Sequence, residues 1–199
     1  MNLSTSALVL GDLQNDFLHP DGAYGRAGLS NPEIAAIPGK LAPLVHAARS
    51  SQMPIVATLF TLVPGRGGAP LIAPHLKSLR PFLGKGDFAP GSWGQQLVDE
   101  LGPADIAVEK IAYSAFHVSR LEWVLRKCGI EQIYFTGIVT NGGVASTVRD
   151  AHMREFECAV IEDSCAVFSV ELHNAAIEGL RPIAKIVSIA DVLKDIAAS

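Results

Sequence analysis

FTGIVTNGGVASTVRDA, residues 135–151, passes from an apolar run through a glycine-rich turn directly into a helix-forming segment. Gly143 stands at that turn. An abrupt strand-to-helix turn presents its residues at the carboxyl end of a sheet, where several backbone N–H groups can converge on an anion or oxyanion. The stretch therefore predicts an α/β architecture and a place for chemistry within it.

Apolar runs bounded by turn residues alternate along the chain with segments of helical periodicity. The runs are 7–10, 55–59, 106–108, 133–136, 159–161 and 183–187, and the helical segments include 34–51 and 119–128. This alternation favours a mainly parallel sheet with helices on both faces. Right-handed crossovers then give a doubly wound, Rossmann-like sheet of six strands. We expect one α/β domain over residues 1–199, a length that allows a sizeable core.

Four segments that each follow a predicted strand carry the candidate site. Asp12 follows the first strand, the loop from Phe60 to residue 69 the second, Lys110 the third, and the turn 139–143 the fourth. Ligands of doubly wound sheets bind beyond the carboxyl ends of the strands. The segment 62–91, rich in proline and glycine, is predicted to be an ordered excursion over the same rim, either as a lid or binding loop or as a surface excursion without a role in binding.

Composition and charge narrow the class of partner. The net charge is −4, and no cluster of lysine and arginine indicates binding to nucleic acid or to an anionic membrane, so a small-molecule substrate is expected. No apolar run is long enough to span a bilayer, and the N-terminus lacks the features of a signal peptide. Cys128, Cys158 and Cys165 lack disulfide or metal spacing, which predicts reduced thiols in a cytoplasmic protein.

Three motifs in order resemble those of the isochorismatase-like hydrolases, also called the cysteine hydrolase superfamily. They are GDLQNDF around Asp12, VEKIAYSAF around Lys110, and the turn at Gly143. The resemblance spans nearly the whole chain and implies the isochorismatase-like fold and a homo-oligomer. It assigns acid/base catalysis to Asp12 and places Gln14 near the substrate. Lys110 would stabilise negative charge on the substrate. The resemblance also implies a cis peptide bond just before Thr140.

One departure from the family pattern decides the expected chemistry. Most relatives carry a cysteine nucleophile where this chain has Gly143, so an acyl-enzyme through this residue is excluded. Isochorismatases proper also resemble this chain in having glycine there, and they cleave a vinyl ether without a covalent intermediate. We therefore expect a metal-free hydrolase of a small anionic molecule, with Asp12 as acid/base and water as the attacking group. The alternatives are an amide (C–N) hydrolase using activated water, and a non-catalytic binding protein.

The remaining candidates are substrate-binding residues. They are Gln14, Phe60, Arg66, Val139, Thr140, Asn141 and Gly142. Arg66 either pairs with a substrate carboxylate or is a solvated loop residue. Six histidines are dispersed along the chain, and we predict no catalytic metal and no cofactor. Cys165 follows the fifth strand, where a packed thiol is favoured over a nucleophile.

Overall fold

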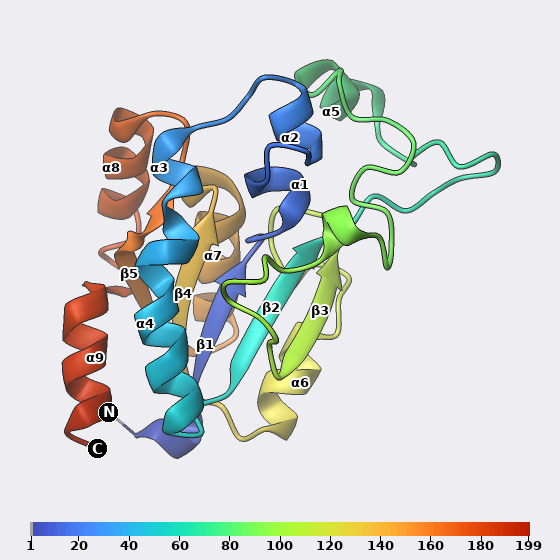
Figure 1. Ribbon diagram of the computed structural model, residues 1–199. Coiled ribbons are helices and arrows are strands. Elements are labelled where there is room, and N and C mark those ends of the chain that lie inside the picture. The colour runs from blue at the N-terminus through green and yellow to red at the C-terminus, as the bar shows by residue number, and fades with distance from the viewer. Residues whose placement is uncertain (1) are drawn as a thin grey trace.

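The computed structural model describes residues 2–199, and within them six strands form one sheet in which every neighbouring pair is parallel (Figure 1). The strands are β1 (Ser6–Gly11), β2 (Ile55–Phe60), β3 (Ile106–Lys110), β4 (Gln132–Ile138), β5 (Glu157–Ala166) and β6 (Lys185–Val187). Their spatial order is β3-β2-β1-β4-β5-β6. This order is that of a doubly wound fold, whose ligand crevice lies where the winding reverses, between β1 and β4. The predicted fold class is confirmed.

All six predicted strands are present, with changes at their ends. The fourth and fifth extend beyond the apolar runs, to Gln132–Ile138 and Glu157–Ala166. The last begins two residues later than expected, because the backbone N–H groups of Ile183 and Ala184 donate to the carbonyl of Leu180. Those two residues therefore continue the turn after the preceding helix.

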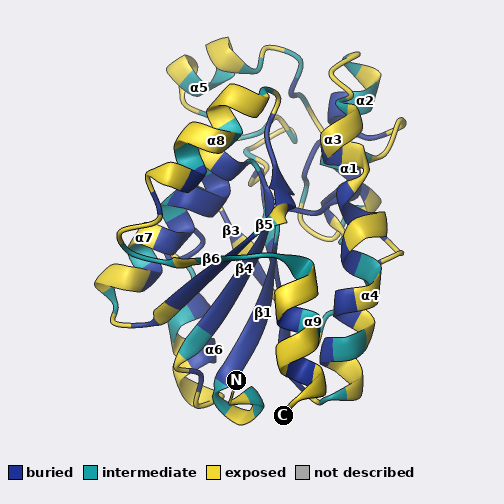
Figure 2. Cartoon of the chain, turned by 90° about the vertical axis from the view of Figure 1, so that its left-hand side faces the viewer, coloured by how far each residue is buried: buried dark blue, intermediate teal, exposed yellow. Residues whose placement is uncertain are grey.

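Helices cover both faces of the sheet, as Figure 2 shows. The α-helices of the described chain are α1 (Asn15–Leu18), α2 (Ala23–Arg26), α3 (Pro32–Ala35), α4 (Ile37–Ser50), α5 (Pro74–Leu79), α6 (Leu121–Lys127), α7 (Ala145–Met153), α8 (Val170–Glu178) and α9 (Ile189–Ala197). Short turns of other helix types are η1 (Leu3–Thr5), η2 (Trp93–Gln95) and η3 (Thr140–Val144). None of the helices in the described chain is long and apolar enough to cross a membrane.

The sheet divides the core into two layers because successive side chains of a strand point to opposite faces. Leu8 and Leu10 of β1 belong to the apolar cluster formed with α4 and α9. Ala7 and Val9 of the same strand belong to the cluster formed with α6, α7 and α8. Burial on both faces explains why β1 has a continuous apolar run instead of an alternating one.

The predicted helix over 34–51 is two helices, separated at Ala36. Pro38 is the second residue of α4, and it has no N–H with which to continue the hydrogen-bond ladder from α3. The other predicted helix, over 119–128, is observed as α6, from Leu121 to Lys127.

The segment 62–91 contains α5 and lies over the carboxyl ends of the strands, together with α2 (Figure 1). Its residues Leu62, Leu83 and Phe88 pack with Tyr24 of α2 in a small apolar cluster of their own. Asp16 joins the two parts, since its carboxylate accepts hydrogen bonds from the backbone N–H groups of Ala23, at 2.8 Å, and Phe88, at 2.6 Å. This segment is the ordered cover that the sequence predicts.

Candidate active site

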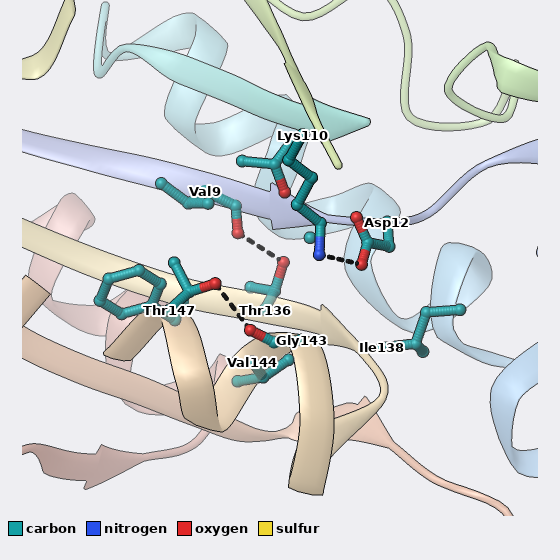
Figure 3. A pocket seen from close by; sticks show the side chains of 11 residues that line it. Val9, Asp12, Lys110, Thr136, Ile138, Gly143, Val144 and Thr147 are labelled. Atoms are coloured by element: carbon teal, nitrogen blue, oxygen red, sulfur yellow. Dashed lines mark hydrogen bonds and ion pairs between the residues drawn. The ribbon is translucent and has the colours of Figure 1, made fainter. Parts of the chain in front are cut away.

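Asp12 and Lys110 form a buried ion pair at the carboxyl ends of β1 and β3 (Figure 3). Lys110 Nζ lies 2.7 Å from Asp12 Oδ2. Asp12 is 5% exposed and Lys110 3%, so water screens their attraction very little. The sheet order brings them together, because β1 and β3 both neighbour β2.

The two ends of this pair differ in how fully they are bonded. Lys110 Nζ also donates to the carbonyls of Ala112, at 3.2 Å, and Tyr113, at 2.9 Å, so all three ammonium protons have acceptors. In contrast, Asp12 Oδ1 is buried and has no hydrogen-bond partner in the described chain. Burial raises the pKa of Asp12 above its ordinary value, and the Lys110 ammonium opposes this shift. The carboxyl group is thus suited to exchange a proton through Oδ1.

Gly143 lies directly against the ion pair, on η3 between β4 and α7 (Figure 3). A Cβ at this position would stand 3.0 Å from Asp12 Oδ2 and 3.4 Å from Lys110 Nζ. Its φ lies outside the left-handed region, so the backbone is open to residues with side chains. The turn therefore holds glycine where a side chain would meet both charged groups.

The motif after Lys110 is tied to the glycine turn by Thr147. The Thr147 hydroxyl donates to the carbonyl of Gly143 at 2.6 Å and accepts from the N–H of Ala115 at 3.0 Å. A cis peptide bond precedes the turn between Ile138 and Val139, which is one residue earlier than the bond before Thr140 that the sequence led us to expect.

The ion pair lines a cavity of about 470 Å³. Its walls come from the strand ends, from α2, and from the segment 62–91, and they are mostly apolar. Three charged residues line it, Asp12, Lys110 and Arg80. A much smaller space of about 10 Å³ adjoins Gly143 and is bounded by Asp12, Lys110 and the side chains of Thr58, Thr136 and Thr147. A cavity of several hundred Å³ with a few convergent polar groups is typical of small-molecule sites.

The sequence profile of the isochorismatase domain matches residues 6–191. The chain belongs to the isochorismatase family. As a member of this family the protein is a hydrolase, and its ion pair lies where the three sequence motifs converge.

Relatives of this isochorismatase-family protein include a ureidoacrylate amidohydrolase, RutB, from Caulobacter vibrioides. The two are 34% identical over 80% of this chain and 76% of the relative. The same-named protein of Methylobacterium radiotolerans is 33% identical over 89% of this chain and 73% of its own length.

Solved structures share the fold. A cysteine hydrolase from Pseudomonas syringae pv. phaseolicola superposes with a TM-score of 0.85 at 24% identity, covering 100% of this chain and 95% of that one. An N-carbamoylsarcosine amidase from Thermoplasma acidophilum gives 0.72 at 24% identity, over 93% and 96%.

Only some of the substrate-binding residues that the sequence predicts line the cavity. Phe60 and Val139 line the cavity. Gln14 lies close by but is fully buried, and its amide is used within the protein: Nε2 donates to the carbonyls of Phe60 and Gln95, while Oε1 accepts from the Phe60 N–H. Gln14 therefore fixes the end of β2.

The other expected residues lie away from the cavity lining. Thr140 is buried, and its hydroxyl is 2.9 Å from His173 Nδ1. Asn141 is exposed, and Gly142 is partly exposed beside the Tyr113 ring. Arg66 is exposed on the loop between Pro64 and Pro70.

Sequence reasoning missed a cation and two tyrosines that do line the cavity. Arg80 Nε donates to the Tyr24 hydroxyl at 2.8 Å, and its NH2 group donates to the Tyr113 hydroxyl at 3.3 Å. Arg80 follows α5 and precedes a proline, so its sequence context predicts only the end of a helix. Periodicity gives no signal for the direction of its side chain.

The thiols of this hydrolase lie outside the cavity lining. Burial raises the pKa of Cys165 to about 12, and that of Cys158 also to about 12, so both are protonated and unreactive at neutral pH. Within residues 2–199 no group of three or more histidine, cysteine, aspartate or glutamate side chains is placed to hold a metal ion.

Proposed function

We propose that this protein hydrolyses a small molecule with Asp12 as the general acid/base and water as the attacking group, without a covalent enzyme intermediate. The observation that carries the proposal is the position of Gly143 against the Asp12–Lys110 pair. The carboxylate stands beside the place of a nucleophile, but that place offers no thiol. Water must then supply the attacking oxygen.

The surroundings of Asp12 support this role for water. The space of about 10 Å³ beside Gly143 approaches the size of one water molecule, and its walls carry the carboxylate and the hydroxyl groups that such a water needs as partners. Lys110 holds Oδ2 in place, and Oδ1 is left to take or give a proton. The fixed ammonium can also stabilise negative charge that develops on the substrate.

The bond that we propose is a C–N bond in an amide or ureido group. The relatives that support it are the ureidoacrylate amidohydrolases, which match most of this chain at 33–34% identity. In this reaction Asp12 removes a proton from water as it attacks the carbonyl carbon, and then returns the proton to the leaving nitrogen. A carboxylate whose pKa is raised by burial is a stronger base than an exposed one.

The raised pKa of Asp12 favours a second candidate, cleavage of a vinyl ether. That reaction needs Asp12 to begin protonated and to deliver its proton to the enol-ether carbon, after which water adds to the oxocarbenium ion. Burial makes the protonated form accessible, although Lys110 alone would favour the ionised form.

A hydrolysis screen tests the proposal. Isochorismate, ureidoacrylate, N-carbamoyl amino acids and simple amides are incubated with the wild type, and the Asp12→Asn variant is the blank. We expect turnover of a ureido or amide compound, with no adduct on the intact protein by mass spectrometry. An adduct on Cys165 would contradict the proposal, and no turnover of any compound would favour a non-catalytic binding protein.

The pH dependence distinguishes the two bonds. If Asp12 acts as a base, activity is lost as the pH falls through its pKa, because the carboxylate becomes protonated. If it acts as an acid, activity is lost as the pH rises through the same pKa. We expect the loss on the acid side, at a pH above the ordinary range for aspartate.

Assembly and location are parts of the same proposal. The family resemblance supports a homo-oligomer, which light scattering would measure. The scattered cysteines support a cytoplasmic location.

A further inference from the structure

Arg80 is a cation without an acidic partner on the wall of the active-site cavity. Its guanidinium donates to two neutral hydroxyl groups, those of Tyr24 and Tyr113. No carboxylate of residues 2–199 lies within ion-pair distance of it. The positive charge of this side chain is therefore uncompensated within the described chain.

The tyrosines position the guanidinium but do not neutralise it. Tyr24 is 6% exposed, and burial raises the pKa of its hydroxyl, which keeps the group neutral at physiological pH. Tyr113 lies beneath the guanidinium, with Arg80 Cζ 6.0 Å from the centre of its ring. Two hydroxyls and a ring thus restrict the orientation of a side chain that is otherwise flexible.

The positive charge of Arg80 stands out from the other residues that line the cavity. Asp12 and Lys110 compensate each other at 2.7 Å, which leaves Arg80 as the unpaired charge among the residues that line the cavity. Most of the other lining residues are aliphatic or aromatic. Arg80 is half-buried in these surroundings, so its cation has lost part of its hydration and gains from an anion that joins it. Guanidinium groups also match carboxylates geometrically, through two parallel hydrogen bonds.

We propose that Arg80, oriented by Tyr24 and Tyr113, binds a carboxylate of the substrate. The substrate is then a small carboxylic acid whose apolar body fills the cavity and whose scissile bond reaches Asp12. This inference rests on the proposed function only in placing the substrate in that cavity. The competing possibility is that Arg80 is a strut that joins Tyr24 to Tyr113 and has no role in binding.

Binding without turnover tests the inference. The probes are phenylacetate and hexanoate, with phenethyl alcohol and hexanol as neutral counterparts, and affinities are measured by isothermal titration calorimetry. Wild type is compared with Arg80→Met and with Arg66→Met, which removes an exposed arginine from the same segment. Arg80→Gln is the second variant, in case Arg80→Met does not fold.

We expect the dissociation constant of at least one carboxylate to rise about ten- to a hundredfold in Arg80→Met, the range for a lost charge-assisted hydrogen bond. Arg66→Met should leave it unchanged, and the alcohols should bind wild type and Arg80→Met alike. Equal losses for carboxylates and alcohols would identify Arg80 as a strut. The inference also fails if wild type binds no carboxylate more tightly than its alcohol, or if Arg66→Met has the same effect as Arg80→Met.

The result of this binding experiment does not depend on the result of the hydrolysis screen. Carboxylate binding that depends on Arg80 can be observed in a protein that turns over none of the screened compounds. Conversely, a ureido or amide hydrolase whose carboxylate affinity ignores Arg80 would retain the proposed function and contradict this inference.

Discussion

The two walls of the active-site cavity are built differently. One wall is the rim of the sheet, where Asp12 follows β1, Lys110 ends β3 and Gly143 lies in the turn after β4. These three residues pack against each other in the protein interior. The opposite wall is the segment 62–91 together with α2, where Arg80 is partly exposed and Tyr24 belongs to a small separate apolar cluster. We therefore propose that bond cleavage depends on the buried rim and substrate choice on the wall opposite it.

The largest expected effect is that of Asp12→Asn, on the rim. Turnover should fall by about a hundred- to ten-thousandfold, because proton transfer is lost while the shape is kept. Asparagine also tolerates the left-handed backbone at this position, where φ is 58°. Steady-state kinetics and a thermal melt would measure both properties. Asp21→Asn, which alters an exposed carboxylate, is the control, and wild-type rates in Asp12→Asn would exclude the assigned role.

Lys110→Met should have the next largest effect. We expect turnover to fall by about a hundredfold or more, since a preorganised charge beside the substrate is removed. The variant also leaves Asp12 buried without its partner, so the free energy of unfolding should fall by up to about 3–5 kcal/mol. Denaturant titration would measure this loss. The double variant Asp12→Asn with Lys110→Met should recover much of the stability, and a failure to recover it would mean that Lys110 stabilises the fold by other contacts.

Gly143→Cys should have a moderate effect on native turnover and create a reactive thiol. The new Cβ would lie 3.0 Å from Asp12 Oδ2 and 3.0 Å from the carbonyl oxygen of Ile138, so the carboxylate and the backbone before the turn must each move by a few tenths of an ångström. Because a misplacement of 1 Å can lower the rate about a hundredfold, we expect this smaller movement to lower native turnover by roughly tenfold. The thiol should react quickly with a limiting alkylator, because Asp12 can take its proton and Lys110 favours the thiolate.

For Gly143→Cys, mass spectrometry would compare the labelling of the introduced thiol with that of the exposed Cys128. Reaction no faster than at Cys128 would contradict the placement of Gly143 at the centre of the site. Gly137→Cys is the contrasting variant, since φ there is 112° and a Cβ would stand 2.0 Å from the carbonyl oxygen of Gly11. That variant should not fold.

The smallest effect is expected on the opposite wall, in Tyr24→Phe. Loss of the hydroxyl that accepts from Arg80 Nε removes one of the two hydrogen bonds that orient the guanidinium, which should raise KM by about threefold to tenfold and leave kcat nearly unchanged. Tyr134→Phe also removes a tyrosine hydroxyl, but outside the cavity lining, and should leave both constants unchanged. A fall in kcat with an unchanged KM would show that this wall takes part in the chemical step.

The sequence could predict the rim because its signals are local. Each strand contains an apolar run, each site residue lies at the end of a strand or in the turn after it, and parallel strands end at a common edge. These signals placed Asp12, Lys110 and the turn at one rim, and the resemblance of their motifs to the isochorismatase-like hydrolases assigned Asp12, Lys110 and Gly143 to the site. The late start of β6 and the break in the helix at Ala36 depend on hydrogen bonds at element ends, where sequence patterns are least informative.

The opposite wall could not be predicted in the same way. Its segment has no hydrophobic period, so the sequence does not indicate which side chains turn inward. Arg66 and Arg80 are equally plausible by residue type, yet only Arg80 lines the cavity, where tertiary contacts with Tyr24 and Tyr113 hold it. Gln14 shows that a matching motif can also mislead. The motif placed Gln14 near the substrate, but its side chain is hydrogen-bonded to Phe60 and fixes the end of β2.

The conformation of Asp12 has a consequence for laboratory evolution of this protein. Its φ of 58° is unfavourable for most residues with a side chain, its charge is buried, and Oδ1 has no partner in the described chain. Each of these features lowers the stability of the native state, so the catalytic role that we propose for Asp12 conflicts with heat resistance. Selection for heat resistance alone should replace positions 12 and 110 together and yield robust, inactive variants. A screen for thermostable versions of this hydrolase therefore has to monitor turnover in every round.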